Sequence, residues 1–174
     1  MQTRSDYLLA ALLLVSAGLN LFQLRQLRAI RTHDGLQSGS AVPPIAASTL
    51  DGRRTVIPVS GELPTMLYVF SPRCGWCDRN RALIVRLETL LRGRYRLVGI
   101  SLSESGLSEY LAAMPLPFPV YQNPSVEVLQ AYQMGSTPQT IFLTNDGKVE
   151  RAWNGAFVAE LKEELEAFLK VKDL

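Results

Sequence analysis

Residues 65–80 read TMLYVFSPRCGWCDRN, and this stretch decides the fold. Residues 65–71 form a continuous run of strand length without polar alternation, which predicts a buried central strand. Cys74 and Cys77 follow it directly. From residue 76 to residue 91 apolar side chains recur with helical spacing, and Gly93 is expected to end that helix. The two cysteines are therefore predicted at a strand–turn–helix junction.

Strand and helix patterns alternate over the rest of the chain. Residues 45–59 place an Asp51-Gly52 turn between two β-prone stretches, which predicts a hairpin. Further strands are expected at residues 95–102, 117–121, 140–144 and 148–153, and helices at residues 105–114, 125–133 and 158–171. The strands on either side of the turn at residues 145–147 should pair antiparallel. This alternation predicts an α/β fold with helices flanking a sheet.

Composition fits one globular domain with a short appendage. The chain has 174 residues, of which 47% are hydrophobic and 20% charged. Its net charge of +2 comes from scattered side chains, so no nucleic-acid surface is expected. The only histidine, His33, lies outside the predicted domain, which excludes a Cys/His dyad or a Ser/His/Asp triad there. Two cysteines and one remote histidine are too few for a four-ligand zinc site, so neither a metal nor a cofactor is expected.

The N-terminal segment is strongly apolar. Residues 8–22 read LLAALLLVSAGLNLF, and with interfacial neighbours they approach the ~20 residues that cross a bilayer. The small residues Val15-Ser16-Ala17 offer a cleavage site, which keeps a cleaved, secreted form open, but the apolar pattern beyond them favours an uncleaved signal-anchor. We therefore expect a single transmembrane helix and juxtamembrane segment in residues 1–31. A linker rich in Gly, Ser and Pro is expected at 32–44, and the globular domain at 45–174.

The motif Cys74-Gly75-Trp76-Cys77 carries the expected chemistry. A sulfur at a helix N-terminus faces unpaired backbone N–H groups, which favour its thiolate form, so Cys74 is the predicted nucleophile. Cys77 lies one helical turn further and can resolve a mixed disulfide by closing the Cys74–Cys77 bond. Trp76 precedes the apolar stripe of the helix and is expected to lie exposed beside the sulfurs, as a platform for substrate. The pattern predicts thiol-disulfide exchange with protein disulfides or dithiols.

Two alternative functions remain open at this point. A thiol peroxidase would use Cys74 with Ser71, a hydroxyl residue three positions earlier that would orient the peroxide. Peroxidases of this kind also have a proline four residues before that hydroxyl, where this chain has Leu67. A non-catalytic binding module would only dock a partner. Three arginines near the motif are expected at the surface, and Arg73 is the one placed to assist the thiolate; the three are Arg73, Arg79 and Arg81.

The order of these features resembles a thioredoxin-fold protein: a strand, the CGWC motif, a helix, and later Ser136-Thr137-Pro138 directly before another strand. The resemblance implies a thioredoxin-like fold with a central mixed β-sheet. It also implies that Pro138 is cis and faces the disulfide, while Thr137 presents its backbone to the substrate chain. Three further features resemble the membrane-anchored, TlpA-like branch of these proteins: the N-terminal apolar segment, the hairpin around LDGRRTV and the segment ending in PFPVYQN. Within the globular part of the chain, the resemblance covers residues 45–174.

Membership of that branch would imply partners and a location. Its members reduce disulfides in target proteins, including apocytochromes c, and a membrane electron donor re-reduces them. Their domain faces the outside of a bacterial-type cytoplasmic membrane. The arginines here suggest the opposite orientation, because positive charges favour the cytoplasmic side of a membrane. Arg25, Arg28 and Arg31 follow the apolar segment, whereas only Arg4 precedes it. The resemblance leaves the direction of electron flow open.

Two positions depart from the family pattern. Thioredoxins carry a buried Asp six residues before the first cysteine, where this chain has Tyr68. TlpA-like reductases often carry Glu three residues after the second cysteine, where this chain has Asn80. No buried carboxylate is therefore expected to take the proton from Cys77, and water, the backbone or Tyr68 would have to assist.

Overall fold

The computed structural model describes residues 13–23, 36–158, 160–172 and 174. The chain divides into two compact units, Met1–Gly35 and Leu36–Leu174. Residues 13–23 are helical and exposed. Among the described residues, no helix combines the length and the apolar character that a membrane crossing needs. The rest of the predicted anchor, its flanking arginines and His33 lie outside the described residues, so the transmembrane helix stays a prediction.

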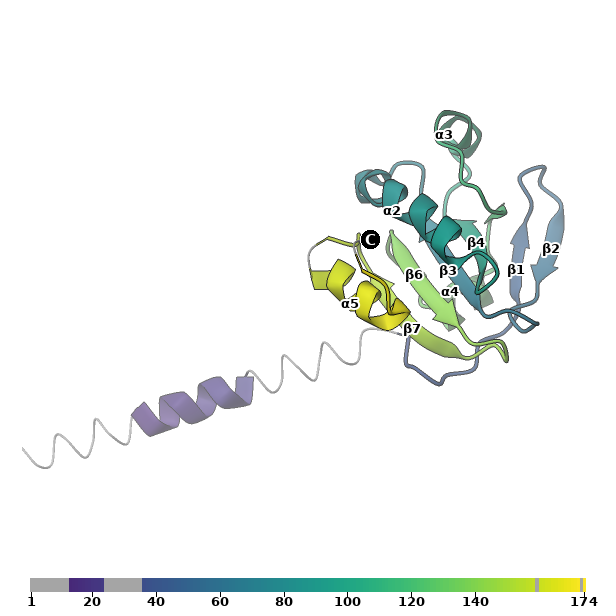
Figure 1. Ribbon diagram of the computed structural model, residues 1–174. Coiled ribbons are helices and arrows are strands. Elements are labelled where there is room, and N and C mark those ends of the chain that lie inside the picture. The colour runs from purple at the N-terminus through teal and green to yellow at the C-terminus, as the bar shows by residue number, and fades with distance from the viewer. Residues whose placement is uncertain (1–12, 24–35, 159, 173) are drawn as a thin grey trace, which may run out of the picture. The chain divides into compact units, whose positions relative to one another are not determined.

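The domain is built on a mixed seven-stranded sheet with the order β2-β1-β5-β4-β3-β6-β7 (Figure 1). Its strands are β1 (Ile45–Ser48), β2 (Arg54–Ile57), β3 (Thr65–Phe70), β4 (Arg96–Ser101), β5 (Val120–Gln122), β6 (Gln139–Leu143) and β7 (Val149–Asn154). Strand β3 pairs parallel with β4 and antiparallel with β6, and all its residues are buried. The prediction of a buried central strand ahead of the cysteines is confirmed.

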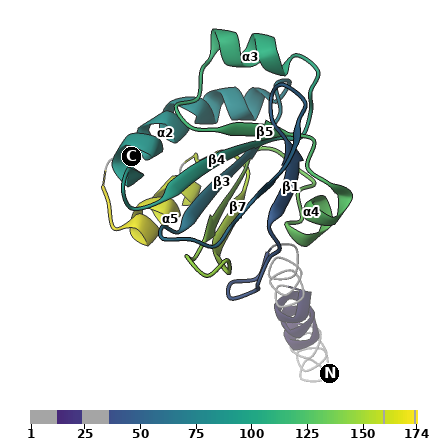
Figure 2. The same ribbon diagram turned by 90° about the vertical axis from the view of Figure 1, so that its right-hand side faces the viewer.

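Helices cover both faces of this sheet. They are α2 (Gly75–Leu91), α3 (Leu107–Ala113), α4 (Val126–Ala131) and α5 (Glu160–Leu169). Helix α4 lies across the sheet from α2 and α5 (Figure 2). Buried side chains of α2, α3 and α5 join one core cluster, and those of α4 join the other, beside β1 and β2. This is the α/β architecture that the alternating patterns predicted.

Local sequence signals set several of the element boundaries. Gly93, with a φ of 76°, follows α2, and two N–H groups turn back to the Leu91 carbonyl. The β1–β2 hairpin turns at Asp51-Gly52, where the glycine has a φ of 85°. The strand predicted at 117–121 is found at Val120–Gln122. Pro117 and Pro119 explain this shift, because proline has no N–H to donate to a ladder.

Residues 36–44 are a correction to the predicted linker. They belong to the compact unit, and they pair with the start of β7 instead of leading freely into the domain. The Gly39 amide donates to the Val149 carbonyl at 2.7 Å, and the Val149 amide donates back to Ser40 at 2.8 Å. Leu36 and Val42 pack against the core on the α4 side. Their Gly-, Ser- and Pro-rich composition indicated a linker because backbone pairing leaves no apolar periodicity in the sequence.

Candidate active site

Cys74 and Cys77 form a disulfide at the N-terminus of α2, with their Cα atoms 5.2 Å apart. Cys74 is the N-cap residue, and its sulfur accepts a hydrogen bond from the Cys77 amide at 3.1 Å. Cys77 is fully buried, whereas Cys74 is half-buried. The two sulfurs therefore differ in access, and only that of Cys74 can meet a protein substrate without a structural change.

The sequence between β3 and α2 explains this placement. The Cys74 amide donates to the Ser71 carbonyl at 3.1 Å, which closes a turn with Pro72 at its second position. Proline fixes the φ angle that this turn position needs. Cys74 itself has extended backbone angles, φ −97° and ψ 99°, as an N-cap residue requires. The turn thus delivers Cys74 to the positive end of the helix dipole.

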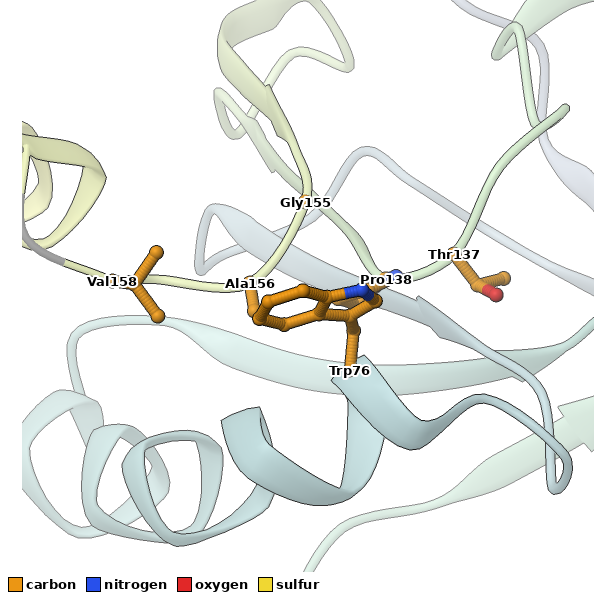
Figure 3. Close-up of a pocket in the computed structure, with 6 residues that line it drawn as sticks. All are labelled: Trp76, Thr137, Pro138, Gly155, Ala156 and Val158. Atoms are coloured by element: carbon orange, nitrogen blue, oxygen red, sulfur yellow. The ribbon is translucent and has the colours of Figure 1, made fainter.

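Trp76 and the loop before β6 form one side of a shallow cavity beside the disulfide. The Thr137-Pro138 peptide bond is cis, as the resemblance implied. The Trp76 indole is 53% exposed and lies between Pro138 and Ala156 (Figure 3). The cavity has a volume of about 260 Å³ and is lined by Trp76, Thr137, Pro138, Gly155, Ala156 and Val158. Its walls are mostly apolar, and an extended peptide could lie along them.

The arginines around the motif have their own partners. Arg73 donates to the Ser105 hydroxyl at 2.8 Å, so its guanidinium is held toward α3. Arg79 lies over the exposed Trp76 ring, 4.6 Å from its centroid, in a cation–π contact. Arg81 donates to the Pro115 carbonyl at 3.2 Å. These contacts give Arg73 and Arg81 structural roles and place Arg79 at the rim of the cavity.

Tyr68 and Asn80, the two departures from the family pattern, both lie in the buried layer around Cys77. The Tyr68 hydroxyl donates to the Cys77 carbonyl at 3.4 Å, and its ring stacks on Phe70. Burial raises the pKa of Tyr68 well above its ordinary value, and Tyr110 raises it further. Tyr68 is therefore neutral at physiological pH. It can donate a hydrogen bond, but it has no phenolate to act as a base.

The structure brings together five predicted site residues where β3 ends and β6 begins, at one end of the central strands. They are Cys74, Cys77, Trp76, Thr137 and Pro138, and Gly75 lies between the two cysteines as the first residue of α2. Sequence reasoning missed Gly155, Ala156 and Val158, which supply the opposite wall of the cavity. Gly155, with a φ of 103°, is the one local signal for a sharp turn after β7. Nothing in the spacing of residues 155–158 indicated that they approach a motif so far away in the sequence.

Comparison with known proteins agrees with this fold. No protein-family model matches the chain. A thioredoxin-like protein of Haemophilus influenzae is 28% identical over 95 residues, and the match spans 53% of this chain and 54% of the relative, about half its length. The thiol-disulfide oxidoreductase ResA of Geobacillus thermodenitrificans is 24% identical over 133 residues, which cover 74% of this chain and 76% of the relative.

Solved structures show the same fold at low identity. StoA from Bacillus subtilis superposes with a TM-score of 0.57 at 22% identity, over 72% of this chain and 98% of that chain. The thioredoxin domain of a thiol-disulfide oxidoreductase from Bacteroides vulgatus superposes with a TM-score of 0.62 at 16% identity, over 78% of this chain and 99% of that one.

The chain thus has a thioredoxin-like fold, with a mixed central sheet and a Cys-X-X-Cys disulfide at the start of α2. More particularly, the two curated relatives are named a thioredoxin-like protein and a thiol-disulfide oxidoreductase, and the TlpA-like type expected from the sequence fits these names.

Proposed function

We propose that this chain is a thiol-disulfide oxidoreductase that acts by dithiol/disulfide exchange through Cys74 and Cys77. The observation that carries the proposal is the asymmetry of the pair: a half-buried sulfur at the helix N-cap is joined to a fully buried one. The partial positive charge of the helix N-terminus favours the thiolate of Cys74, and the thiolate is the form that attacks disulfides. Residue 74 is thus built to attack and residue 77 to resolve.

In the reductive direction, the Cys74 thiolate attacks one sulfur of a target disulfide. The target bond breaks, a mixed disulfide forms, and the departing target sulfur takes a proton from water. Cys77 then loses its proton and attacks the Cys74 sulfur. The mixed disulfide breaks, the second target sulfur leaves as a thiol, and the Cys74–Cys77 bond is restored. Two electrons have passed from this protein to the target.

The proposed targets, electron donor and location follow from the resemblance to the TlpA-like branch. We propose extracytoplasmic proteins, apocytochromes c among them, as the targets, and a membrane electron donor as the source of re-reduction. The apolar residues 8–22 support anchoring of the domain outside a bacterial-type cytoplasmic membrane. An alkaline-phosphatase fusion after residue 174 tests this location: activity supports it, and its absence would favour the orientation indicated by Arg25, Arg28 and Arg31.

Trapping of mixed disulfides tests the exchange itself. In the full chain, Cys77→Ser should accumulate mixed disulfides with target proteins, because Cys74 still attacks but nothing resolves the product. The matched variant Cys74→Ser should accumulate few, since its remaining thiol is buried. The measurement is the yield of thiol-sensitive high-mass species on non-reducing gels.

Three results would argue against the proposal. Equal trapping by both variants would contradict the roles given to the two cysteines. No trapping by either variant would favour a binding module that only docks its partner. Rapid peroxide consumption coupled to oxidation of Cys74 would favour the thiol peroxidase.

A further inference from the structure

Arg79 differs from the two other arginines near the Cys-X-X-Cys motif. Arg73 and Arg81 donate hydrogen bonds to other parts of the chain. The exposed Arg79 side chain instead lies over the Trp76 ring, 4.6 Å from its centroid. None of the ion pairs formed by the described residues includes it. A cation over a ring is held by its charge and not by its N–H groups, so the Arg79 guanidinium keeps donors for a ligand.

The sequence of α2 explains why no carboxylate of this helix pairs with Arg79. Side chains three and four positions apart in a helix are neighbours on its surface. At those distances from Arg79 the chain has glycine, tryptophan, alanine and leucine, none of which is acidic. Asp78 is adjacent in sequence, but its carboxylate contacts Tyr110 of α3, and burial together with this contact raises the pKa of Tyr110 to about 12. The Arg79 guanidinium is therefore open to a carboxylate from another molecule.

The Trp76 ring connects this charge to the cavity beside the disulfide. The indole forms one side of the cavity and Val158 belongs to the opposite wall (Figure 3), and each of these side chains is 53% exposed. In the described part of the chain, no charged residue belongs to the cavity lining. The volume of about 260 Å³ is below the ~300–1,000 Å³ of small-molecule sites, so the cavity fits one or two side chains of a peptide. The site thus combines a largely apolar cavity with the Arg79 cation at its rim.

We propose that Arg79 is a specificity-determining residue that selects target proteins with an acidic side chain close to the attacked cysteine. The inference rests on the exchange reaction proposed above and names the kind of target that it favours. An apolar side chain of the target fills the cavity, and the target's carboxylate pairs with the guanidinium over Trp76. A basic segment is disfavoured because it brings like charges together. The pair is exposed to solvent, so it gives a modest gain that acts mainly on the rate of association.

Peptides of matched sequence test this selection with the full-length reduced protein. Each peptide has a single cysteine next to a leucine, joined through a disulfide to 2-thiopyridine, and one residue near the cysteine, on either side, is Glu, Gln or Lys. The Cys74 thiolate attacks the peptide sulfur, a mixed disulfide forms, and the thiopyridine leaves as an uncharged, absorbing thione with a proton from water. The rate constant for release of the thione is divided by that of 2-mercaptoethanol with the same peptide, which removes the intrinsic effect of the peptide's charge.

The wild-type protein should react about two- to fivefold faster with a Glu peptide than with its Gln counterpart, which is the gain that an exposed ion pair supplies. High salt should remove this preference, because it screens exposed charges. Arg79→Gln should abolish the preference, and Arg79→Glu should reverse it in favour of the Lys peptide. Arg86→Gln is the matched control: it removes the same charge from another exposed position of α2, about two turns further from the cavity, and should keep the preference.

A purely structural role for Arg79 gives a different result. If the guanidinium only held the Trp76 ring in place, Arg79→Gln would slow all peptides alike and leave the Glu-to-Gln ratio unchanged, which would overturn the inference. A wild-type protein without the Glu preference, or an equal loss of it in Arg86→Gln, would overturn it as well. In each of these cases thione is still released and Cys77→Ser still traps targets, so the inference can fail while the proposed exchange holds.

Discussion

At the scale of single residues, the site divides the work between two sulfurs that differ in environment. Cys74 lies half-buried at the positive end of a helix, and Cys77 lies fully buried beneath it. The helix N-terminus favours the anion at Cys74, whereas burial opposes it at Cys77. The order of attack and resolution follows from this difference in location.

This asymmetry predicts the reactivity of Cys74. In reduced Cys77→Ser protein, we expect the pKa of the Cys74 thiol to lie below that of a free cysteine, because the helix N-terminus stabilises its thiolate. The measurement is the rate of alkylation by iodoacetamide against pH, with unfolded protein as the reference. A rate that rises at the same pH in the folded and unfolded protein would show that the N-cap position has no such effect.

Sequence reasoning predicted one side of the site and missed the other. The predicted side depends on short sequence motifs: CGWC, which contains the two cysteines and Trp76, and the Thr137-Pro138 pair before a strand. The loop at 155–158 carries no such signal, because its role depends on how β7 returns toward α2. Asn80 was noticed as a departure from a pattern, but the hydrogen bond that its oxygen accepts from the Phe157 amide could be seen only in the structure.

At the scale of elements, helix α5 is fastened to strand β7 through the carboxylate of Glu164. Trp153 donates to it from its indole nitrogen at 3.0 Å, and Arg151 donates at 3.2 Å. The pKa of Glu164 is lowered by these two contacts, Trp153 having the larger effect. Apolar packing of Leu165 and Leu169 into the core completes the attachment.

The lowered pKa of Glu164 predicts a pH-dependent stability. A carboxyl group whose pKa is depressed by folding stabilises the protein above its ordinary pKa, and this contribution is lost as the pH falls through the folded pKa. Glu164→Gln should therefore lower the free energy of unfolding at neutral pH. The loss should be at most about 1 kcal/mol, because the pair is partly exposed, and it should disappear in acid.

Denaturant unfolding of the oxidised protein at several pH values measures this effect. Glu163→Gln is the matched control, since it makes the same change of charge at the preceding, exposed position of α5, for which the described part of the chain provides no ion pair. A difference between the two variants that persisted unchanged in acid would argue against the carboxylate as its source.

The elements themselves were largely predictable, and their boundaries less so. Strand β3 and helix α2 have unmistakable patterns, because one is buried on both faces and the other carries an apolar stripe. Because prolines precede β5, the sequence did not show at which residue its strand pairing begins. Residues 36–44 were assigned to a linker because their contacts to β7 are made by backbone groups, which leave no pattern in the side chains.

At the scale of the whole molecule, those residues define where the folded domain starts. The Tyr132 hydroxyl, on a fully buried side chain, donates to the Pro43 carbonyl, and further backbone bonds join residues 39–42 to residues 147–149. A protein beginning at residue 45 would lose all of these contacts and leave the buried hydroxyl without its acceptor.

Truncation tests this boundary. A chain of residues 45–174 should be less stable than one of residues 36–174 by roughly 2 kcal/mol or more, the sum of lost hydrogen bonds and lost packing. Urea unfolding of the two oxidised proteins measures the difference, with the full chain as the reference for 36–174. Equal stability of the two truncated proteins would mean that residues 36–44 are an appendage after all.

The pairing of residues 39–42 with the start of β7 also bears on colloidal behaviour. Strand β7 forms one border of the sheet, and an open border is a template for strands of neighbouring molecules. The opposite border, β2, is short and carries the charged Arg54, which discourages such contacts. On the β7 side the chain's own backbone occupies part of the ladder. The segment before β1 thus covers part of the β7 edge and hinders edge-to-edge aggregation. Its removal should make the protein prone to self-association as well as less stable.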